Sequence, residues 1–219
     1  MIKIYIMPHL EDYMTYYQSL YGVESQLTTK YTNEKSKMES ISTEVLLNYA
    51  LFDTYQNKLS FPIETSKNGK PVLINETGIH FNKSHSKKYG LVVISTHEIG
   101  CDIEYIKSDF KLIPNVLTAK ELQVYEAAHE RTKPNIFYKY WTAKESFLKL
   151  QGIGITKKLS NYHYEFINDH EGFIENNYIH QFIIDMHLVA IATKYKQEIE
   201  VYHVDKNLID KFLISIKSL

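Results

Sequence analysis

The stretch from Phe137 to Lys149 reads FYKYWTAKESFLK and carries the most informative spacing in the chain. Apolar side chains recur there every three or four residues, which places them on one face of a helix. The residues of this apolar face are Phe137, Tyr140, Ala143, Phe147 and Leu150. A second face carries Trp141, Glu145 and Lys149, which are neighbours on a helix because they lie four residues apart. The sequence therefore predicts an amphipathic helix over about 135–150.

The charge of this region differs from that of the whole chain. Residues 136–158 contain five lysines and one acid, whereas the 219 residues together carry 25 basic and 26 acidic side chains. Glu145 and Lys149 could form an ordinary surface pair, worth a few tenths of a kcal/mol. The local lysine excess instead favours a site for an anionic ligand. The near-neutral total excludes binding of nucleic acid or anionic lipid by bulk charge.

The segments around this helix fall into two runs with the same order of expected elements. After a strand-like segment at 1–6, the first run consists of a helix over 42–55 and a turn at 68–71, followed by strands at 79–81 and 90–95. In the second run, a capping box at 118–121 opens a helix, the helix over 135–150 ends at Gly152, and strands follow at 162–166, 178–184 and 187–193. These patterns predict an α+β fold. Periodicity alone leaves open whether the runs are related halves or unrelated segments.

Two acids lie close together in Ile99-Gly100-Cys101-Asp102-Ile103-Glu104, a segment with the pattern of a strand. Alternation along a strand puts Asp102 and Glu104 on the same face. Adjacent carboxylates repel each other unless a cation lies between them, and Mg²⁺ with phosphate oxygens in its shell would meet that need. The pattern also fits a solvated strand face, because Asp-x-Glu alone is common.

A third polar segment combines Gly69-Lys70-Pro71 with Asn82-Lys83-Ser84-His85-Ser86-Lys87-Lys88. Hydroxyls, an imidazole and lysines in a loop after a strand can bind phosphate, because serine donates an O–H and protonated histidine donates two N–H groups. An ordinary polar surface loop would have the same composition. Arg131 is the only arginine, so a phosphate site would use lysine, hydroxyl and backbone donors rather than guanidinium forks.

Together these segments match one family in order and residue type. The motifs are Gly69-Lys70-Pro71, Phe81-Asn82-x-Ser84-His85-Ser86, Gly100-x-Asp102-x-Glu104 and Trp141-x-x-Lys144-Glu145-Ser146-x-x-Lys149-x-x-Gly152-x-Gly154. The set resembles the Sfp-type phosphopantetheinyl transferases over about residues 67–154. The resemblance implies two similar pseudo-symmetric lobes, each a small antiparallel sheet packed on a long helix. The lobes would span 1–104 and 105–219, with the site in the cleft between them.

The resemblance also implies roles for individual residues. Asp102, Glu104 and Glu145 would hold Mg²⁺. Lys144 and Lys149 would stabilise the pyrophosphate, with Lys149 and Glu145 as the catalytic residues and Glu145 the candidate base. The residues implied to contact phosphates of coenzyme A are Lys70, Ser84 and His85, with His85 at the adenosine side. An upstream helix, where the family often places arginines, offers lysines and a serine, of which Lys37 and Ser40 are the selected candidates.

The reaction implied by the resemblance is transfer of phosphopantetheine from coenzyme A to a serine of an acyl or peptidyl carrier protein. This converts an apo carrier to its holo form. The nucleophile then belongs to the partner, which agrees with a sequence lacking a convincing Ser-His-Asp or Cys-His arrangement. The duplicated length resembles members that serve polyketide or nonribosomal peptide synthesis. Alternatives are a non-catalytic coenzyme A or nucleotide-binding module of the same fold and a Mg²⁺-dependent phosphohydrolase.

Two positions depart from the family pattern. Lys83 stands where the family usually has an aliphatic residue, so either the loop is repacked or Lys83 adds a cation beside the phosphates. Cys101 replaces a valine or isoleucine and is expected to be a small buried hydrophobe rather than a catalytic thiol.

The segment from Tyr105 to Pro134 is implied to help receive the carrier protein. Its apolar residues are Phe110, Leu112, Ile113, Val116 and Leu117, and the lysines beside them are Lys107, Lys111 and Lys120. A carrier helix is amphipathic and acidic, so this apolar ridge with flanking lysines could bind it. An internal helix contact would explain the same residues.

Cys101 is the only cysteine, which excludes an intramolecular disulfide and favours a reducing compartment. The chain begins with a strand-like pattern rather than a signal sequence, and its most apolar late stretch, 182–192, is too short to cross a bilayer. We therefore expect a cytoplasmic protein, monomeric and without nucleic-acid or membrane partners.

Overall fold

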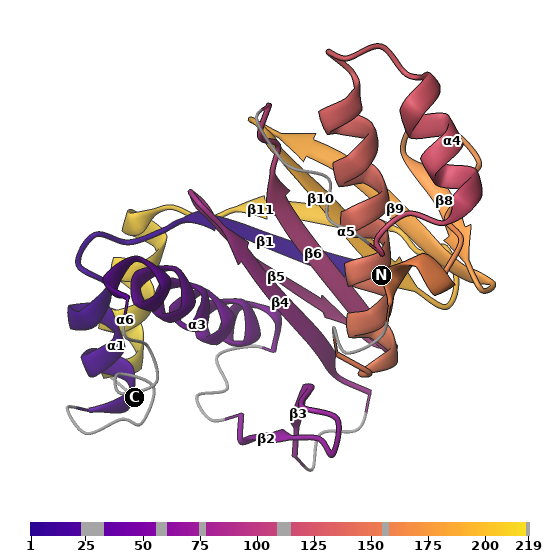
Figure 1. Ribbon diagram of the computed structural model, residues 1–219. Coiled ribbons are helices and arrows are strands. Elements are labelled where there is room, and N and C mark those ends of the chain that lie inside the picture. The colour runs from indigo at the N-terminus through magenta and orange to yellow at the C-terminus, as the bar shows by residue number, and fades with distance from the viewer. Residues whose placement is uncertain (23–32, 56–60, 75–77, 109–114, 155–157, 218–219) are drawn as a thin grey trace.

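The computed structural model describes residues 1–22, 33–55, 61–74, 78–108, 115–154 and 158–217 (Figure 1). Its first sheet has four strands in the order β11-β1-β5-β4. These strands are β1 (Ile2–Pro8), β4 (His80–Ser86), β5 (Tyr89–Ser95) and β11 (Ile199–His203). β5 runs antiparallel to β1 and β4, whereas β11 runs parallel to β1.

The second sheet has five antiparallel strands in the order β6-β10-β9-β8-β7. They are β6 (Ile99–Tyr105), β7 (Glu165–Phe166), β8 (Glu171–Ile174), β9 (Asn177–Ile184) and β10 (His187–Thr193). A separate pair, β2 (Ile63–Thr65) and β3 (Pro71–Leu73), flanks the turn at Gly69. Gly69 has a φ of 86°, a left-handed conformation that glycine adopts without strain.

The described helices are α1 (Tyr13–Tyr21), α3 (Glu34–Thr54), α4 (Ala119–Ala127), α5 (Lys133–Gln151) and α6 (Lys206–Lys217), with a short 3₁₀ helix, η1 (Leu159–Asn161). The predicted capping box forms, because Thr118 and Glu121 bond each other's backbone N–H groups. The predicted end of α5 is also present, with Gly152 left-handed at φ 65°. The α+β class is confirmed, with a second sheet that is antiparallel throughout and a first sheet that is antiparallel except for the parallel pair of β1 and β11. Within the described segments, no helix has the length and apolar character needed to cross a membrane.

Each long helix packs against one sheet at a glycine. α3 lies on β5 at Gly90, where an added Cβ would meet Thr43 Oγ1 at 2.7 Å. α5 lies on β6 at Gly100, where an added Cβ would lie 2.1 Å from the carbonyl oxygen of Ser146. Buried apolar clusters fill the interfaces of α3 with the first sheet and of α5 with the second. A third cluster, which includes Ile4 and Cys101, joins the two sheets.

The two halves of the sequence exchange elements. β6 lies almost entirely within residues 1–104 but pairs with β10 in the second sheet. β11 and α6 lie within residues 105–219, yet β11 pairs with β1 and α6 packs beside α1 and α3 (Figure 1). The boundary between the sheets therefore does not coincide with position 104.

β4 and β6, edge strands of different sheets, meet along a seam of side-chain hydrogen bonds. Asn82 Oδ1 accepts from the Cys101 N–H at 2.9 Å, and Ser86 Oγ accepts from the Tyr105 N–H at 3.1 Å. The prediction of a polar loop after residue 81 was wrong, because residues 82–86 continue β4. Their polar side chains replace a backbone ladder at this seam, so the strand remains ordered without apolar alternation.

The strand predicted over 162–166 is also shorter than expected, since only Glu165 and Phe166 pair. The backbone N–H of Tyr164 donates instead to the Glu121 carboxylate at 2.8 Å, and that of Tyr162 donates to the Leu159 carbonyl at 3.1 Å.

Candidate functional site

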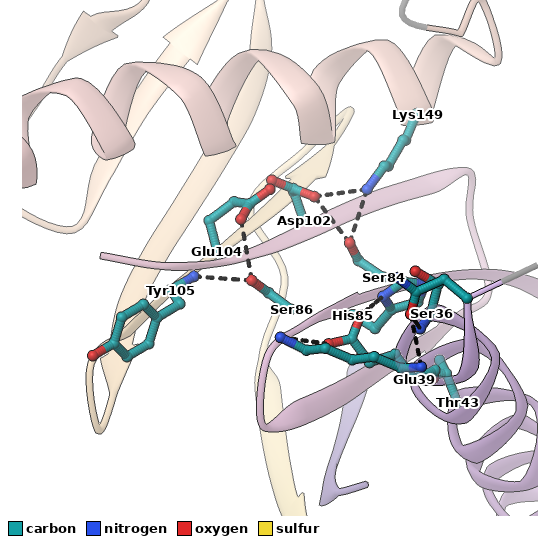
Figure 2. Close-up of polar contacts among 12 residues, drawn as sticks. Ser36, Glu39, Thr43, Ser84, His85, Ser86, Asp102, Glu104, Tyr105 and Lys149 are labelled. Atoms are coloured by element: carbon teal, nitrogen blue, oxygen red, sulfur yellow. Dashed lines mark hydrogen bonds and ion pairs between the residues drawn. The ribbon is translucent and has the colours of Figure 1, made fainter. Parts of the chain in front are cut away.

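Asp102 lies at the centre of the candidate site, on the face of β6 that points toward α5 (Figure 2). Its Oδ1 accepts hydrogen bonds from Lys149 Nζ at 2.7 Å and from Ser84 Oγ at 2.9 Å. Lys149 Nζ also lies 2.9 Å from Ser84 Oγ. The three side chains come from β6, α5 and β4, so the site is assembled where the two sheets and α5 meet.

Glu104 lies two residues along the same strand face, as alternation predicts. Its Oε2 accepts a hydrogen bond from Ser86 Oγ at 3.1 Å. Burial, followed by the nearby Asp102 charge, raises the pKa of Glu104 to about 7. Ser84 and Ser86 are two residues apart on β4 and therefore lie on the same face of the strand, so both contribute to the site.

Glu145 projects from α5 and is only 3% exposed. Burial and then the charge of Asp102 raise the pKa of its carboxyl to about 7. Among the described residues, neither Glu145 Oε1 nor Asp102 Oδ2 has a hydrogen-bond partner, although both atoms are buried. Unpaired buried carboxylate oxygens are costly, so this pair of atoms calls for a ligand.

The donor set fits a hard divalent cation. Asp102, Glu104 and Glu145 offer carboxylate oxygens only, which Mg²⁺ prefers together with water and phosphate oxygens. Within the described ranges, no three Asp, Glu, His or Cys side chains lie close enough together to form a complete metal site by themselves. The two buried oxygens without partners are the observation that favours a cation here.

A pocket of about 230 Å³ adjoins this cluster on the side of Lys149. Its lining residues are Asn68, Gly69, Lys70, Pro71, Phe81, Asn82, Lys83, Lys149, Gly152 and Gly154. Lys70 Nζ is held by Glu98 at 2.7 Å and by the Leu150 carbonyl at 3.2 Å. The Asp102 carboxylate raises the pKa of Lys149 although burial opposes it, so this ammonium stays charged. The pocket can therefore receive an anionic ligand.

Three other expected residues lie near the start of α3. His85 projects from β4 with its Nδ1 3.7 Å from Glu39 Oε2, and burial is the main reason that its pKa is lowered. Lys37 forms an ion pair with Glu34 at 3.6 Å, one turn before Ser40 on the helix. The structure brings His85 to the α3 side of β4, whereas Ser84 points to the α5 side (Figure 2).

Lys144 is not part of the cluster, which corrects its expected contact with pyrophosphate. Its side chain is completely buried, with Nζ paired with Glu121 and bonded to the Val116 carbonyl at 2.7 Å. The spacing shows why, because Lys144 lies four residues after Tyr140 and seven after Phe137, on the apolar face of the helix. Its ammonium holds α4 and the preceding segment against α5.

Replacing Lys144 with Met should lower the free energy of unfolding by about 3 kcal/mol, because Glu121 would keep its charge without its buried partner. Urea unfolding measures this loss. The control is Lys139→Met, which removes a lysine paired with the 90% exposed Asp169 and should change stability by less than about 0.5 kcal/mol. Unchanged stability in Lys144→Met with a higher KM for coenzyme A would restore the phosphate role.

The structure also accounts for the two departures noted in the sequence. Lys83 Nζ pairs with Glu44 on α3, so its charge is offset while its stem lines the pocket. Cys101 is fully buried in the core between the sheets, and burial raises the pKa of its thiol to about 12. Its thiolate is therefore scarce at neutral pH.

The expected carrier surface is only partly described. Phe110, Lys111, Leu112 and Ile113 lie outside the described residues. Of the remainder, Val116 is buried against α5, an internal contact, whereas the lysines at 107 and 120 are exposed.

The structure places acids that the sequence did not indicate next to several expected residues, among them Glu98 beside Lys70. Glu39 lies beside His85, and Glu121 pairs with Lys144. The signal for Glu121 was available, since a lysine on an apolar helix face requires a buried partner. Glu39 had no such signal, because its contact with His85 depends on how α3 crosses β4.

Residues 98–204 match the family model described as the 4'-phosphopantetheinyl transferase superfamily. Over 96 residues, the chain is 38% identical to "4'-phosphopantetheinyl transferase HetI" of Nostoc sp., covering 41% of this chain and 40% of that protein. It is 33% identical to psf-1 of Bacillus pumilus, covering 54% and 52% of the two chains. It is 25% identical to Sfp of Bacillus subtilis, covering 67% and 66%.

These alignments span between two fifths and two thirds of the relatives' lengths, and the matched region contains β6 and α5 with Asp102, Glu104, Glu145 and Lys149. All three relatives are named as transferases of the same kind. The resemblance seen in the sequence is thus confirmed: residues 98–204 belong to the 4'-phosphopantetheinyl transferase superfamily, and the chain is a relative of its Sfp-type members.

Proposed function

We propose that this protein transfers phosphopantetheine from coenzyme A to a serine of an acyl or peptidyl carrier protein, in a reaction that requires Mg²⁺. The observation that carries this proposal is the set of buried carboxylates at the junction of β4, β6 and α5. Two of their oxygens have no partner within the described residues, and Lys149 lies beside them. An anion-receptive pocket opens next to the same cluster.

In this proposal Asp102, Glu104 and Glu145 hold Mg²⁺. When bound, the ion would neutralise pyrophosphate oxygens and favour departure of the adenosine bisphosphate group. Lys149 contributes a fixed positive charge to the same oxygens, since its Nζ is held by Asp102 and Ser84. A preorganised charge of this kind stabilises the charge that develops in the transition state.

Glu145 is the proposed base. Its buried carboxylate lies at the cluster beside Asp102 and Lys149, and it acts on the serine proton directly or through a bound water, because a carboxylate that also holds Mg²⁺ is itself a weak base. The serine oxygen of the carrier forms a bond to phosphorus, the bond from phosphorus to adenosine 3′,5′-bisphosphate breaks, and the serine proton passes to Glu145 directly or through a bound water. No nucleophile of this chain is needed.

We assign the coenzyme to the pocket beside Lys149. Lys70 in the pocket and Ser84, whose Oγ lies 2.9 Å from Lys149 Nζ, contact its phosphates, and Lys70 is preorganised by Glu98 and the Leu150 carbonyl. His85, with Lys37 and Ser40 from α3, receives the adenosine-side phosphate. Lys144 is left out of this assignment because its ammonium is buried against Glu121.

We also infer two related lobes, 1–104 and 105–219, that exchange strands across the seam. The support is the matching contact of each long helix with a strand glycine, α3 at Gly90 and α5 at Gly100. A monomer in the cytoplasm that activates carriers for polyketide or nonribosomal peptide synthesis is the biological setting that we propose.

The test is the release of adenosine 3′,5′-bisphosphate, measured by chromatography in three mixtures. The first contains the protein, coenzyme A and Mg²⁺, the second adds an apo carrier, and the third contains that carrier with its acceptor serine changed to alanine. Release is expected only in the second mixture, and chelation of Mg²⁺ should abolish it. Release in all three mixtures would indicate a phosphohydrolase, and coenzyme binding without release would indicate a non-catalytic module.

A further inference from the structure

Glu39 of α3 and His85 of β4 face each other at the edge of the candidate site (Figure 2). Glu39 Oε2 lies 3.7 Å from His85 Nδ1, and its Oε1 lies 3.9 Å from Lys35 Nζ. Both separations exceed hydrogen-bond length, so Glu39 does not fix the orientation of the imidazole. Its charge nevertheless acts on anything that binds at His85, because the side chain is only 13% exposed and therefore poorly screened.

The other lysines described around His85 form close pairs with carboxylates other than Glu39. Lys83 pairs with Glu44, and Lys149 pairs with Asp102 at 2.7 Å. Lys37, on the same turn of α3, pairs with Glu34 at 3.6 Å. Among the described residues, the lysine that pairs with Glu39 is Lys35. Its side chain is largely exposed, and its Nζ lies 3.9 Å from Glu39 Oε1. A phosphate at His85 would therefore meet a carboxylate whose described lysine partner, Lys35, is 3.9 Å away and largely exposed.

The pKa values of Glu39 and His85 are both shifted by burial at this edge of the site. Burial raises the pKa of Glu39, and the charge of Lys35, which opposes this shift, does not cancel it. Burial and the lysines at 149 and 83 lower the pKa of His85, so the imidazole does not offer a strong compensating charge. The edge of the site at α3 is therefore less favourable to a dianion than the edge at Lys149.

We propose that Glu39 sets the affinity of the site for the adenosine-side phosphate of the coenzyme. Its carboxylate weakens binding of that phosphate at His85. The chain then uses coenzyme A and 3′-dephospho-coenzyme A with similar efficiency. This inference rests on the proposed function, in which His85 receives that phosphate. A unit negative charge within several ångströms of a dianion near a protein surface is worth about a factor of ten in affinity.

The test compares the steady-state kinetics of wild type and Glu39→Gln with the two coenzymes and one carrier. The substitution keeps the volume of the side chain and removes its charge. We expect the KM for coenzyme A to fall about tenfold, the KM for 3′-dephospho-coenzyme A to change less than twofold, and kcat to remain unchanged with both. The matched control is Glu11→Gln, an exposed acid in the same part of the molecule, which should alter neither KM.

A rise in the KM for coenzyme A would overturn the inference, because it would mean that Glu39 supports His85 rather than opposing the phosphate. An equal fall for both coenzymes would overturn it as well. Titration of adenosine 3′,5′-bisphosphate and adenosine 5′-phosphate separates this question from transfer. If transfer fails but Glu39→Gln tightens only the bisphosphate, the inference stands without the proposed function; if transfer occurs without such selective tightening, the inference alone fails.

Discussion

Glu145→Gln is expected to lower the kcat of phosphopantetheine transfer by about 10²- to 10³-fold while coenzyme A binding remains measurable. The amide keeps the shape of the side chain but cannot accept the serine proton and is a poorer ligand for Mg²⁺. The pocket beside Lys149 and the contacts of Lys70 are untouched, so part of the coenzyme affinity should survive. Single-turnover kinetics measure the first effect and calorimetric titration measures the second.

Glu130→Gln provides the matched control for that variant. Glu130 is also an acid near α5, but its side chain is 82% exposed and pairs with Lys133 on the surface. Its replacement should leave transfer within twofold of wild type. A kcat within tenfold of wild type in Glu145→Gln would remove Glu145 from both of its proposed roles.

Gly100→Ala is expected to lower the free energy of unfolding by about 3 kcal/mol or more. The new Cβ would lie 2.1 Å from the carbonyl oxygen of Ser146 and 2.3 Å from the backbone nitrogen of Leu150. Both atoms belong to the backbone of α5, so the whole helix must move. Because that helix carries Glu145 and Lys149, transfer should also fall at temperatures where the variant is folded.

Gly90→Ala is the comparison in the other half of the molecule. Its new Cβ would meet the Thr43 hydroxyl at 2.7 Å, a side-chain atom that can rotate away. The loss of stability, measured by urea unfolding, should be about 1 kcal/mol and clearly smaller than for Gly100→Ala. Equal losses in the two variants would contradict the direct packing of α5 on β6.

Local patterns in the sequence were sufficient for α5 and β6, two of the elements that form the site, but not for β4, whose residues 82–86 were predicted as a loop. The spacing of apolar residues predicted α5, and alternation predicted that Asp102 and Glu104 share a face of β6. These predictions held because each depends on residues a few positions apart. The pairing of β11 with β1 joins residues about 200 positions apart, and nothing local to either strand indicates it.

The site residues also divide into those that local spacing predicts and those that depend on tertiary contacts. Glu145 and Lys149 follow from helix geometry, and the structure places both beside Asp102. The motif position of Lys144 indicates a phosphate contact, whereas the helix face on which it lies indicates burial, and in the structure it is buried against Glu121. Glu39 could not be found, because its distance from His85 depends on the crossing of α3 and β4 rather than on either sequence.

The most direct measurement is the intact mass of an apo carrier protein after incubation with this protein, coenzyme A and Mg²⁺. The carboxylate cluster and the adjoining pocket lead us to expect that each carrier gains one phosphopantetheine group, and that the carrier keeps its apo mass when Asp102→Asn replaces the wild-type protein. A carrier that keeps its apo mass with the wild-type protein, although coenzyme A binds, would contradict the central claim.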